Sequence, residues 1–105
     1  MSEVQIVLST IDTSENARLI ARMLVTERLA ACVSILPPVT SVYRWKDELH
    51  EDPEFQLIIK TATDRVDLLL ERLRQVHPYE VPEMLVLPVP QGLKAYLDWV
   101  RAETR

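Results

Sequence analysis

The stretch LAACVSILPPVTSVYRWKDELHEDPEFQLIIKT, residues 29–61, decides how this chain folds. It predicts two strands, residues 32–45 and 54–61, joined across the charged turn Lys46-Asp47-Glu48. A first arm of about 14 residues would extend roughly 45 Å at ~3.3 Å per residue, whereas a domain of this length has a radius of gyration near ~13 Å. No other segment is long and apolar enough to cover such a hairpin, so we expect its tip to lie against a second copy of the chain.

The segments on either side of the hairpin predict the order β-α-β-β-α-β followed by a last helix. We expect a strand at 4–9, a helix at 14–28, a hairpin strand interrupted by Pro37-Pro38, a helix from Thr63 or Asp64 to 76, a strand at 84–89 and a C-terminal helix carrying Leu93, Tyr96, Leu97 and Val100. Two right-handed βαβ crossovers around one hairpin give a four-stranded antiparallel sheet with helices on one face. The expected fold is an α+β, ferredoxin-like sandwich formed by a single domain over residues 1–105.

Length and composition limit the classes of function. The chain has 105 residues, which is the length of one ordinary domain. A net charge of −4 gives no basic face for phosphates, so nucleic acid is not an expected partner. One cysteine cannot form an internal disulfide, and there is neither a basic leader nor an apolar run long enough to cross a membrane. We therefore expect a cytoplasmic protein without membrane contact.

Residues that could bind a metal ion are few, and none falls in a recognised catalytic or metal-binding motif. Cys32 opens the first hairpin strand, and His77 and Glu80 lie in a proline-rich loop after the second helix. Thiolate and imidazole suit copper or zinc, and a carboxylate adds an oxygen ligand. Each residue also has a structural interpretation, because free cysteine is commonly buried and histidine complements a helix C-terminus. One histidine with one carboxylate is a weak metal signal, and both interpretations stay open.

Four further residues are candidates for lining a cleft near these ligands: Trp45, Lys60, Tyr79 and Glu83. Lys60 lies in an apolar strand, where a lysine either protects a sheet edge or faces an anion. Tyr79 and Glu83 share the proline-rich loop with His77. Both interpretations of Lys60 stay open.

The aromatic residues at the far end of the hairpin need cover. Tyr43 and Trp45 are expected to point the same way, and leaving both exposed would be costly. An aromatic pair at a subunit contact explains them better than a ligand cage does. His50 lies in the charged turn region, where we expect it to be solvated.

Five motifs, in this order, carry a resemblance over nearly the whole chain: Leu29-Ala30-Ala31-Cys32-Val33, Tyr43-x-Trp45, Leu57-Ile58-Ile59-Lys60-Thr61, His77-Pro78-Tyr79-Glu80-Val81-Pro82-Glu83 and Tyr96-Leu97-x-Trp99. They closely resemble the CutA family, the divalent-cation tolerance proteins. The resemblance implies a ferredoxin-like homotrimer in which strands from neighbouring subunits extend one another's sheets. It also implies a role in tolerance of copper and other divalent cations, with metal binding and no established enzymatic reaction.

Two positions depart from the pattern that the resemblance implies. Many family members have glycine at the hairpin turn, where this chain has Asp47, a residue that tolerates left-handed backbone angles. Some relatives carry a cysteine and a second histidine where this chain has Ser9 and Val76. A copper site built on that trio would keep His77 alone, so we expect Cu²⁺ or another divalent ion to bind weakly.

The resulting functional hypothesis is a homotrimer that binds divalent cations weakly through His77, Glu80 and then Cys32. One alternative is a signalling trimer like the PII proteins, which the family resembles in fold, with Lys60 anchoring a small anion. Another is a trimeric scaffold for a partner protein. Catalysis by Cys32, His77 and Glu80 would need contacts of ~3 Å that sequence separation leaves unsupported, so we expect no enzyme activity.

Overall fold

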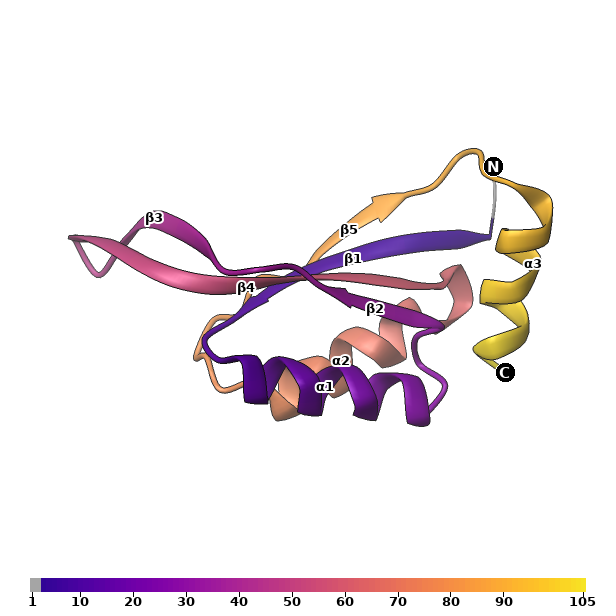
Figure 1. The fold of residues 1–105 in the computed structure, drawn as a ribbon, viewed down its shortest axis with the longest axis horizontal. Coiled ribbons are helices and arrows are strands. Elements are labelled where there is room, and N and C mark those ends of the chain that lie inside the picture. Colours follow the sequence, from indigo (N-terminus) through magenta and orange to yellow (C-terminus); the bar gives the residue numbers. More distant parts are fainter. Residues whose placement is uncertain (1–2) are drawn as a thin grey trace.

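The computed structural model describes residues 3–105 and has the expected α+β fold, with a sheet, two helices beneath it and a helix at one end (Figure 1). The elements are β1 (Val4–Ile11), α1 (Ser14–Thr26), β2 (Cys32–Ile35), β3 (Val39–Trp45), β4 (Glu48–Ala62), the 3-10 turn η1 (Thr63–Arg65), α2 (Val66–Val76), β5 (Leu85–Pro88) and α3 (Lys94–Glu103). All strand pairs are antiparallel, in the order β2-β4-β1-β5, and β3 pairs with the first half of β4. Within residues 3–105, no helix is long and apolar enough to cross a membrane.

The hydrophobic core lies between the sheet and the helices α1 and α2. One face of β1 and β4 contributes fully buried Val7, Leu57 and Ile59, which pack against apolar residues of both helices. The helices present them at helical spacing: Ala17, Ile20 and Leu24 from α1, and Leu69 and Leu73 from α2. Apolar residues recur every second residue along the strands and about every 3.6 residues along the helices. Each element therefore has one apolar face, and these faces pack together as the core.

Among residues 3–105, no helix runs along the opposite sheet face, which we call the open face; α3 packs only at its end, where Val100 meets Val4 (Figure 1). Its central residues are Ile6, Leu8, Ile58, Leu85 and Leu87, which alternate with the core residues along β1, β4 and β5. Leu85 and Leu87 are about half exposed in the isolated chain, at 55% and 44%. An apolar sheet face of this kind is typical of a surface that another layer covers.

The β3–β4 hairpin extends beyond the body of the molecule (Figure 1), and with it the chain is 44 Å long and 25 Å wide. Pro37-Pro38 splits the predicted strand into β2 and β3, so the sheet has five strands where we expected four. Ile35 pairs with Leu57 and Val39 with Glu54, so the proline segment contains one extra residue relative to β4. This is the bulge that paired prolines, which donate no ladder hydrogen bond, are expected to cause.

The second arm of the hairpin is longer than predicted, because β4 begins at Glu48 and not at residue 54. The polar residues 48–53 pair with β3 throughout, and this cross-strand pairing outweighs their poor strand propensity. The turn between the arms has two residues, Lys46 and Asp47, with φ of 49° and 66°. Positive φ at both positions is the type I′ geometry that suits a two-residue hairpin.

Some predicted helix ends were wrong. The first helix ends at Thr26 because Arg28 takes a left-handed conformation with φ of 59°, which closes the helix before the chain enters β2. Neither Thr63 nor Asp64 caps the second helix, because the turn η1 precedes it. Asp64 instead accepts two hydrogen bonds from the Arg105 guanidinium, at 2.9 and 3.0 Å.

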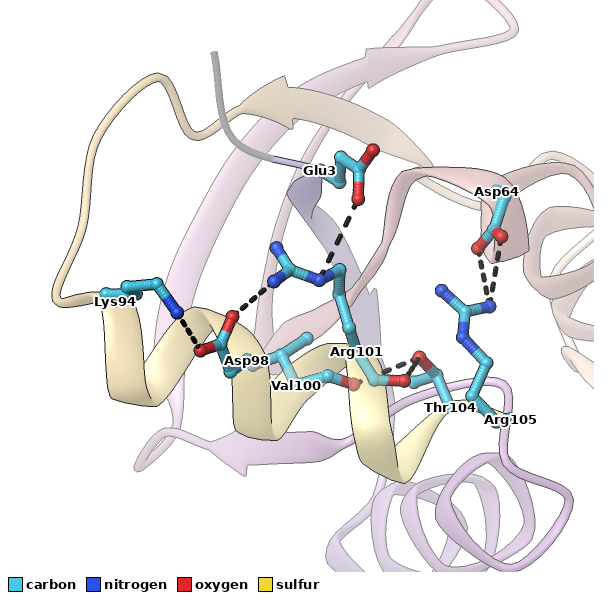
Figure 2. A network of polar contacts seen from close by, with 8 residues as sticks. All are labelled: Glu3, Asp64, Lys94, Asp98, Val100, Arg101, Thr104 and Arg105. Carbon is cyan, nitrogen blue, oxygen red and sulfur yellow. Dashed lines mark hydrogen bonds and ion pairs between the residues drawn. The ribbon is translucent and has the colours of Figure 1, made fainter.

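Helix α3 lies across the end of the sheet that is remote from the hairpin (Figure 1). Its buried Val100 packs with Val4 and Ala31. Figure 2 shows the charged groups of the helix: Asp98 lies between Lys94 and Arg101 within α3, and Arg101 Nε is 3.8 Å from Glu3 Oε2 outside it. The Lys94 ammonium and the Arg101 guanidinium lower the pKa of the Asp98 carboxyl.

Candidate functional site

A cleft of about 650 Å³ opens between the hairpin and the loop of residues 77–83, which we call the His77 loop. The hairpin contributes Tyr43, Trp45 and Glu54 to its walls, and the loop contributes residues 79–83. The cleft thus brings together four residues that the sequence had singled out, Trp45, Tyr79, Glu80 and Glu83. Lys60 and Cys32 are not among its lining residues.

His77 is buried, at 8% exposure, and is not among the residues that line the cleft. Its Nε2 is 2.8 Å from the backbone oxygen of Thr10, and its Nδ1 accepts the backbone N–H of Tyr79 at 3.1 Å. Because a carbonyl can only accept and a backbone N–H can only donate, the pair of contacts fits a neutral ring with its proton on Nε2. Nε2 therefore ties the loop to β1, Nδ1 is bonded to the loop's own backbone, and a metal ion would have to displace one of these bonds.

Tyr79 connects the His77 loop to the hairpin. Its hydroxyl donates to Glu54 Oε2 at 2.8 Å, and its ring meets the His77 ring edge-on with centroids 4.7 Å apart. Burial, and then the hydrogen bond to Glu54, raise the pKa of the Tyr79 phenol well above its usual range. The phenol is thus a fixed hydrogen-bond donor that holds the loop against β4.

The hairpin wall of the cleft is aromatic and acidic. The Tyr43 hydroxyl donates to Asp52 at 2.6 Å, and this bond raises the pKa of the phenol. The same ring stacks on His50 at 5.3 Å between centroids, so His50 is not simply solvated as expected. At the tip, the Lys46 ammonium lies 5.6 Å from the Trp45 ring centroid.

Cys32 and Lys60 lie together on the open face of the sheet, where their strands pair directly. The Lys60 ammonium donates to Ser34 Oγ at 2.6 Å and is 3.7 Å from Cys32 Sγ. Cys32 is a free thiol of intermediate burial. This cluster contains a cation and two neutral groups, so it differs in charge from the acidic cleft at the hairpin.

The three predicted metal ligands are not gathered within one chain. Among residues 3–105, no group of three or more His, Cys, Asp or Glu side chains is arranged to hold a metal ion. Glu80 is exposed and has the Lys46 ammonium at 3.9 Å, while Cys32 lies on the open face beside Lys60. Nor does the chain place Cys32, His77 and Glu80 in contact as a nucleophile, a base and an orienting group.

Sequence reasoning missed two residues that join the hairpin to the His77 loop. Glu54 binds Tyr79 from 25 positions away, and Lys46 reaches Glu80 from 34 positions away. Both depend on where the hairpin folds relative to the His77 loop, which no local motif encodes. The sequence signal that could have indicated an acidic wall is the excess of Asp and Glu over residues 47–54, of which Glu54 lines the cleft.

Comparisons with known proteins agree with this fold and with these motifs. The family model described as CutA1 divalent ion tolerance protein matches residues 5–103. A divalent-cation tolerance protein CutA from Thermus thermophilus is 50% identical over 100 residues, covering 95% of this chain and 97% of the relative.

Solved structures of other proteins also resemble this chain over most of its length. A divalent cation tolerance protein from Thermus thermophilus has a TM-score of 0.93 at 49% identity, covering 97% of this chain and 99% of that one. CutA from Xylella fastidiosa has a TM-score of 0.96 at 41% identity, covering 99% and 100%. The names of these relatives describe cation tolerance or the family, and none names a reaction. The chain therefore belongs to the CutA1 divalent ion tolerance protein family.

Proposed function

We propose that this chain acts in divalent-cation tolerance as a homotrimer whose neighbouring copies cover the open face and the edge strand β5. The relatives' names supply the tolerance role, and the apolar open face supports the assembly. In the isolated chain Leu85 and Leu87 are exposed on a strand that pairs with β1 alone among the described strands. An apolar edge strand is a template for pairing with another chain, and association removes that liability.

Light scattering tests the assembly directly. The parent protein is expected to have three times the 12.1 kDa mass of one chain. Leu87→Lys places a charge on the open face and is expected to lower the mass. Leu19→Lys is the matched control, because Leu19 is exposed on α1, on the far side of the core. A folded parent with the mass of one chain, or equal masses for both variants, would contradict the proposal.

Cellular tolerance tests the role itself. Cells that lack their own family member are expected to grow better in Cu²⁺ when they express the parent chain, and less so with Leu87→Lys. A gain of tolerance that is the same with both proteins would separate the role from the assembly. No gain with the parent chain, at matched protein levels, would contradict the tolerance role.

We also propose that the protein binds divalent cations weakly, with Cu²⁺ as the first ion to test. Of the candidate ligands, Glu80 is the most accessible, whereas His77 has both ring nitrogens engaged and Cys32 lies beside a lysine. We expect Glu80→Gln to weaken the calorimetric isotherm. We expect His77→Ala to lower stability more than Cu²⁺ affinity, and Cys32→Ser to have little effect. Loss of the isotherm in His77→Ala with unchanged unfolding would return His77 to the site.

Lys60 supports a second candidate, a small-anion sensor of the PII type. Its ammonium is held by Ser34 on the open face and makes no ion pair with the described residues. A lysine in an apolar environment attracts an anion or a partner's carboxylate. Thermal-shift measurements with nucleotides and carboxylate metabolites test this, and a shift that Lys60→Met abolishes would favour it. A cytoplasmic location remains a prediction, because one solved relative, from Archaeoglobus fulgidus, is described as periplasmic.

A further inference from the structure

A cavity of about 380 Å³ lies at the end of the molecule remote from the hairpin, and its walls come from the end of α1, the segment after α1, and α3 (Figure 1). We call this cavity the α3 socket. We propose that it receives the loop of residues 89–93 from a second copy of the chain. The inference rests on the homotrimer proposed above and names a contact by which one copy holds the next.

The two edge strands of the sheet determine what lies beside the socket. In the order β2-β4-β1-β5, the strands β2 and β5 lie at opposite edges. Pro88, the last residue of β5, pairs with Gln5 near the start of β1. Cys32, the first residue of β2, pairs with Lys60 near the end of β4. The strand β5 therefore ends, and β2 begins, at the end of the sheet where α3 lies (Figure 1).

A ring of three copies brings these two edges together. Each contact in a ring joins one surface of a copy to a different surface of the next, so the β5 edge of one copy meets the β2 edge of its neighbour. Rotation about an axis along the strands keeps the α3 ends of all copies at one level. The two edges then pair antiparallel, as all strands within the chain do. This pairing places the residues after Pro88 beside the neighbour's socket, which includes Ala30 and Ala31, just before β2.

The loop of residues 89–93 has the shape of an insert. Gly92 lies so close to α3 that a Cβ built on it would be 3.1 Å from Leu97 Cδ2, so the loop backbone is packed against its own helix. Leu93 follows directly and is 75% exposed, the highest value among the large apolar side chains of residues 3–105. Pro90 has no backbone N–H, which lowers the cost of burying the loop. The loop therefore presents an apolar side chain that its own chain leaves uncovered.

The socket offers an apolar floor and a polar rim to such an insert. Ala30 and Ala31 are small and buried, and the Trp99 ring beside them is 43% exposed. At the rim, Arg28 Nη1 is 3.3 Å from Glu103 Oε2, and both side chains stay about half exposed. A guanidinium has five N–H donors, so Arg28 can also donate to the carbonyls of an entering loop. The walls thus fit an apolar side chain flanked by backbone carbonyls.

Disulfide trapping on the full chain tests this contact. In a Cys32→Ser background, Thr26→Cys labels the socket, and Gln91→Cys or Leu93→Cys labels the loop. Oxidation of either pair with copper phenanthroline is expected to give covalent trimers on a non-reducing denaturing gel. Thr26→Cys combined with Gln75→Cys is the matched control, because Gln75 is exposed near the end of α2, beside the His77 loop. The control is expected to stay largely as single chains.

Light scattering on the same samples separates the contact from the assembly. A trimer mass with no covalent trimers from either pair would overturn the socket and leave the homotrimer standing. The mass of one chain before oxidation would overturn both proposals. Equal cross-linking in the control would also overturn the socket, because it would show that the bonds form without regard to position.

Filling the socket provides a second readout. Thr26→Trp places a bulky side chain in the cavity and is expected to speed subunit exchange by about tenfold, since changes at an interface act mainly on dissociation. Native mass spectrometry of mixed tagged and untagged protein measures the exchange. Arg22→Trp is the matched control, because Arg22 is exposed on the same helix and does not line the socket. Equal exchange rates for the two tryptophan variants would overturn the proposal.

Discussion

The two halves of β4 belong to one continuous strand and yet lie in different environments. From Leu57 to Ala62, every second residue is fully buried on the sheet face that α1 and α2 cover. From Glu48 to Glu54, the strand pairs with β3 and most side chains are exposed or half-exposed. Strand pairing alone therefore does not determine burial in this molecule. The helices cover the body half, whereas the hairpin half extends beyond them (Figure 1).

The largest expected effect comes from a matched pair of substitutions in the two halves. Leu57→Ala should reduce the free energy of unfolding by about 2 to 5 kcal/mol, because it leaves a cavity in the core. Leu49→Ala removes the same atoms from a side chain that is 71% exposed, and should cost less than about 1 kcal/mol. Denaturant unfolding at equal protein concentrations measures both. Equal losses would show that the hairpin half is covered as completely as the body half.

Tyr79 binds Glu54, the residue of β4 at which the hairpin half ends. Tyr79→Phe should cost about 1 to 2 kcal/mol at pH 7, since it removes a hydrogen bond to a carboxylate. The pKa of Tyr79 is raised in the folded protein above its ordinary value of 10, so only the unfolded chain loses the proton just above that pH. The contribution of Tyr79 is therefore complete below pH 10 and decreases as the pH rises further.

The corresponding measurement is chemical unfolding at pH 7, 9 and above 10. The parent should lose more stability than Tyr79→Phe between the second and third conditions. Tyr96→Phe, on the exposed face of α3, is the control for a general effect of removing a phenol. Parallel pH profiles for the parent and Tyr79→Phe would mean that Tyr79 is not held by Glu54 in solution.

A smaller effect tests how completely the body half is packed. Ser9 pairs with Leu57, and its hydroxyl is buried with no hydrogen-bond partner among the described residues. Ser9→Ala should raise the free energy of unfolding by about 1 kcal/mol, because an unsatisfied buried hydroxyl is costly. Thr61→Val should lower it, since the Thr61 hydroxyl donates to the Leu29 carbonyl at 2.6 Å. A loss of stability in Ser9→Ala would indicate that a bound water satisfies the hydroxyl.

The smallest effect lies at the tip of the hairpin half. Asp47 has a φ of 66°, which glycine adopts without steric cost. Asp47→Gly should therefore stabilise the protein by about 0.5 kcal/mol, and thermal unfolding should show a small rise in the midpoint. Asp52→Gly, in the paired region of the same hairpin, should lower it. A fall with Asp47→Gly would show that the aspartate side chain itself holds the turn.

Local patterns were enough to predict much of the fold. The apolar periods located both core helices, and Pro37-Pro38 indicated the bulge. The left-handed conformation of Asp47 agrees with the family resemblance, which implies glycine at this turn position. The start of β4 could not be predicted, because residues 48–53 are polar and form a strand only through their pairing with β3.

The candidate site was predictable only in part. The motif around His77 identified the right loop, and Trp45, Tyr79, Glu80 and Glu83 line the cleft beside it. Sequence could not reveal that both nitrogens of His77 are engaged, since one partner is the backbone of Thr10. Nor could it reveal that Lys60 faces Cys32 on another surface, because that depends on strand register.

The extra residue at positions 36–38 controls which way the hairpin faces. With it, Tyr43 pairs with His50 and Trp45 with Glu48, on the side of β4 that carries Glu54. If β3 kept the register of β2, Tyr43 would pair with Leu49, and the alternation of strands would turn both rings to the opposite side. Deleting one residue between Ile35 and Val39 would therefore leave the helices and their core in place. It would turn the Tyr43 and Trp45 rings away from the side of β4 that carries Glu54 and bring Val42 and Arg44 to that side.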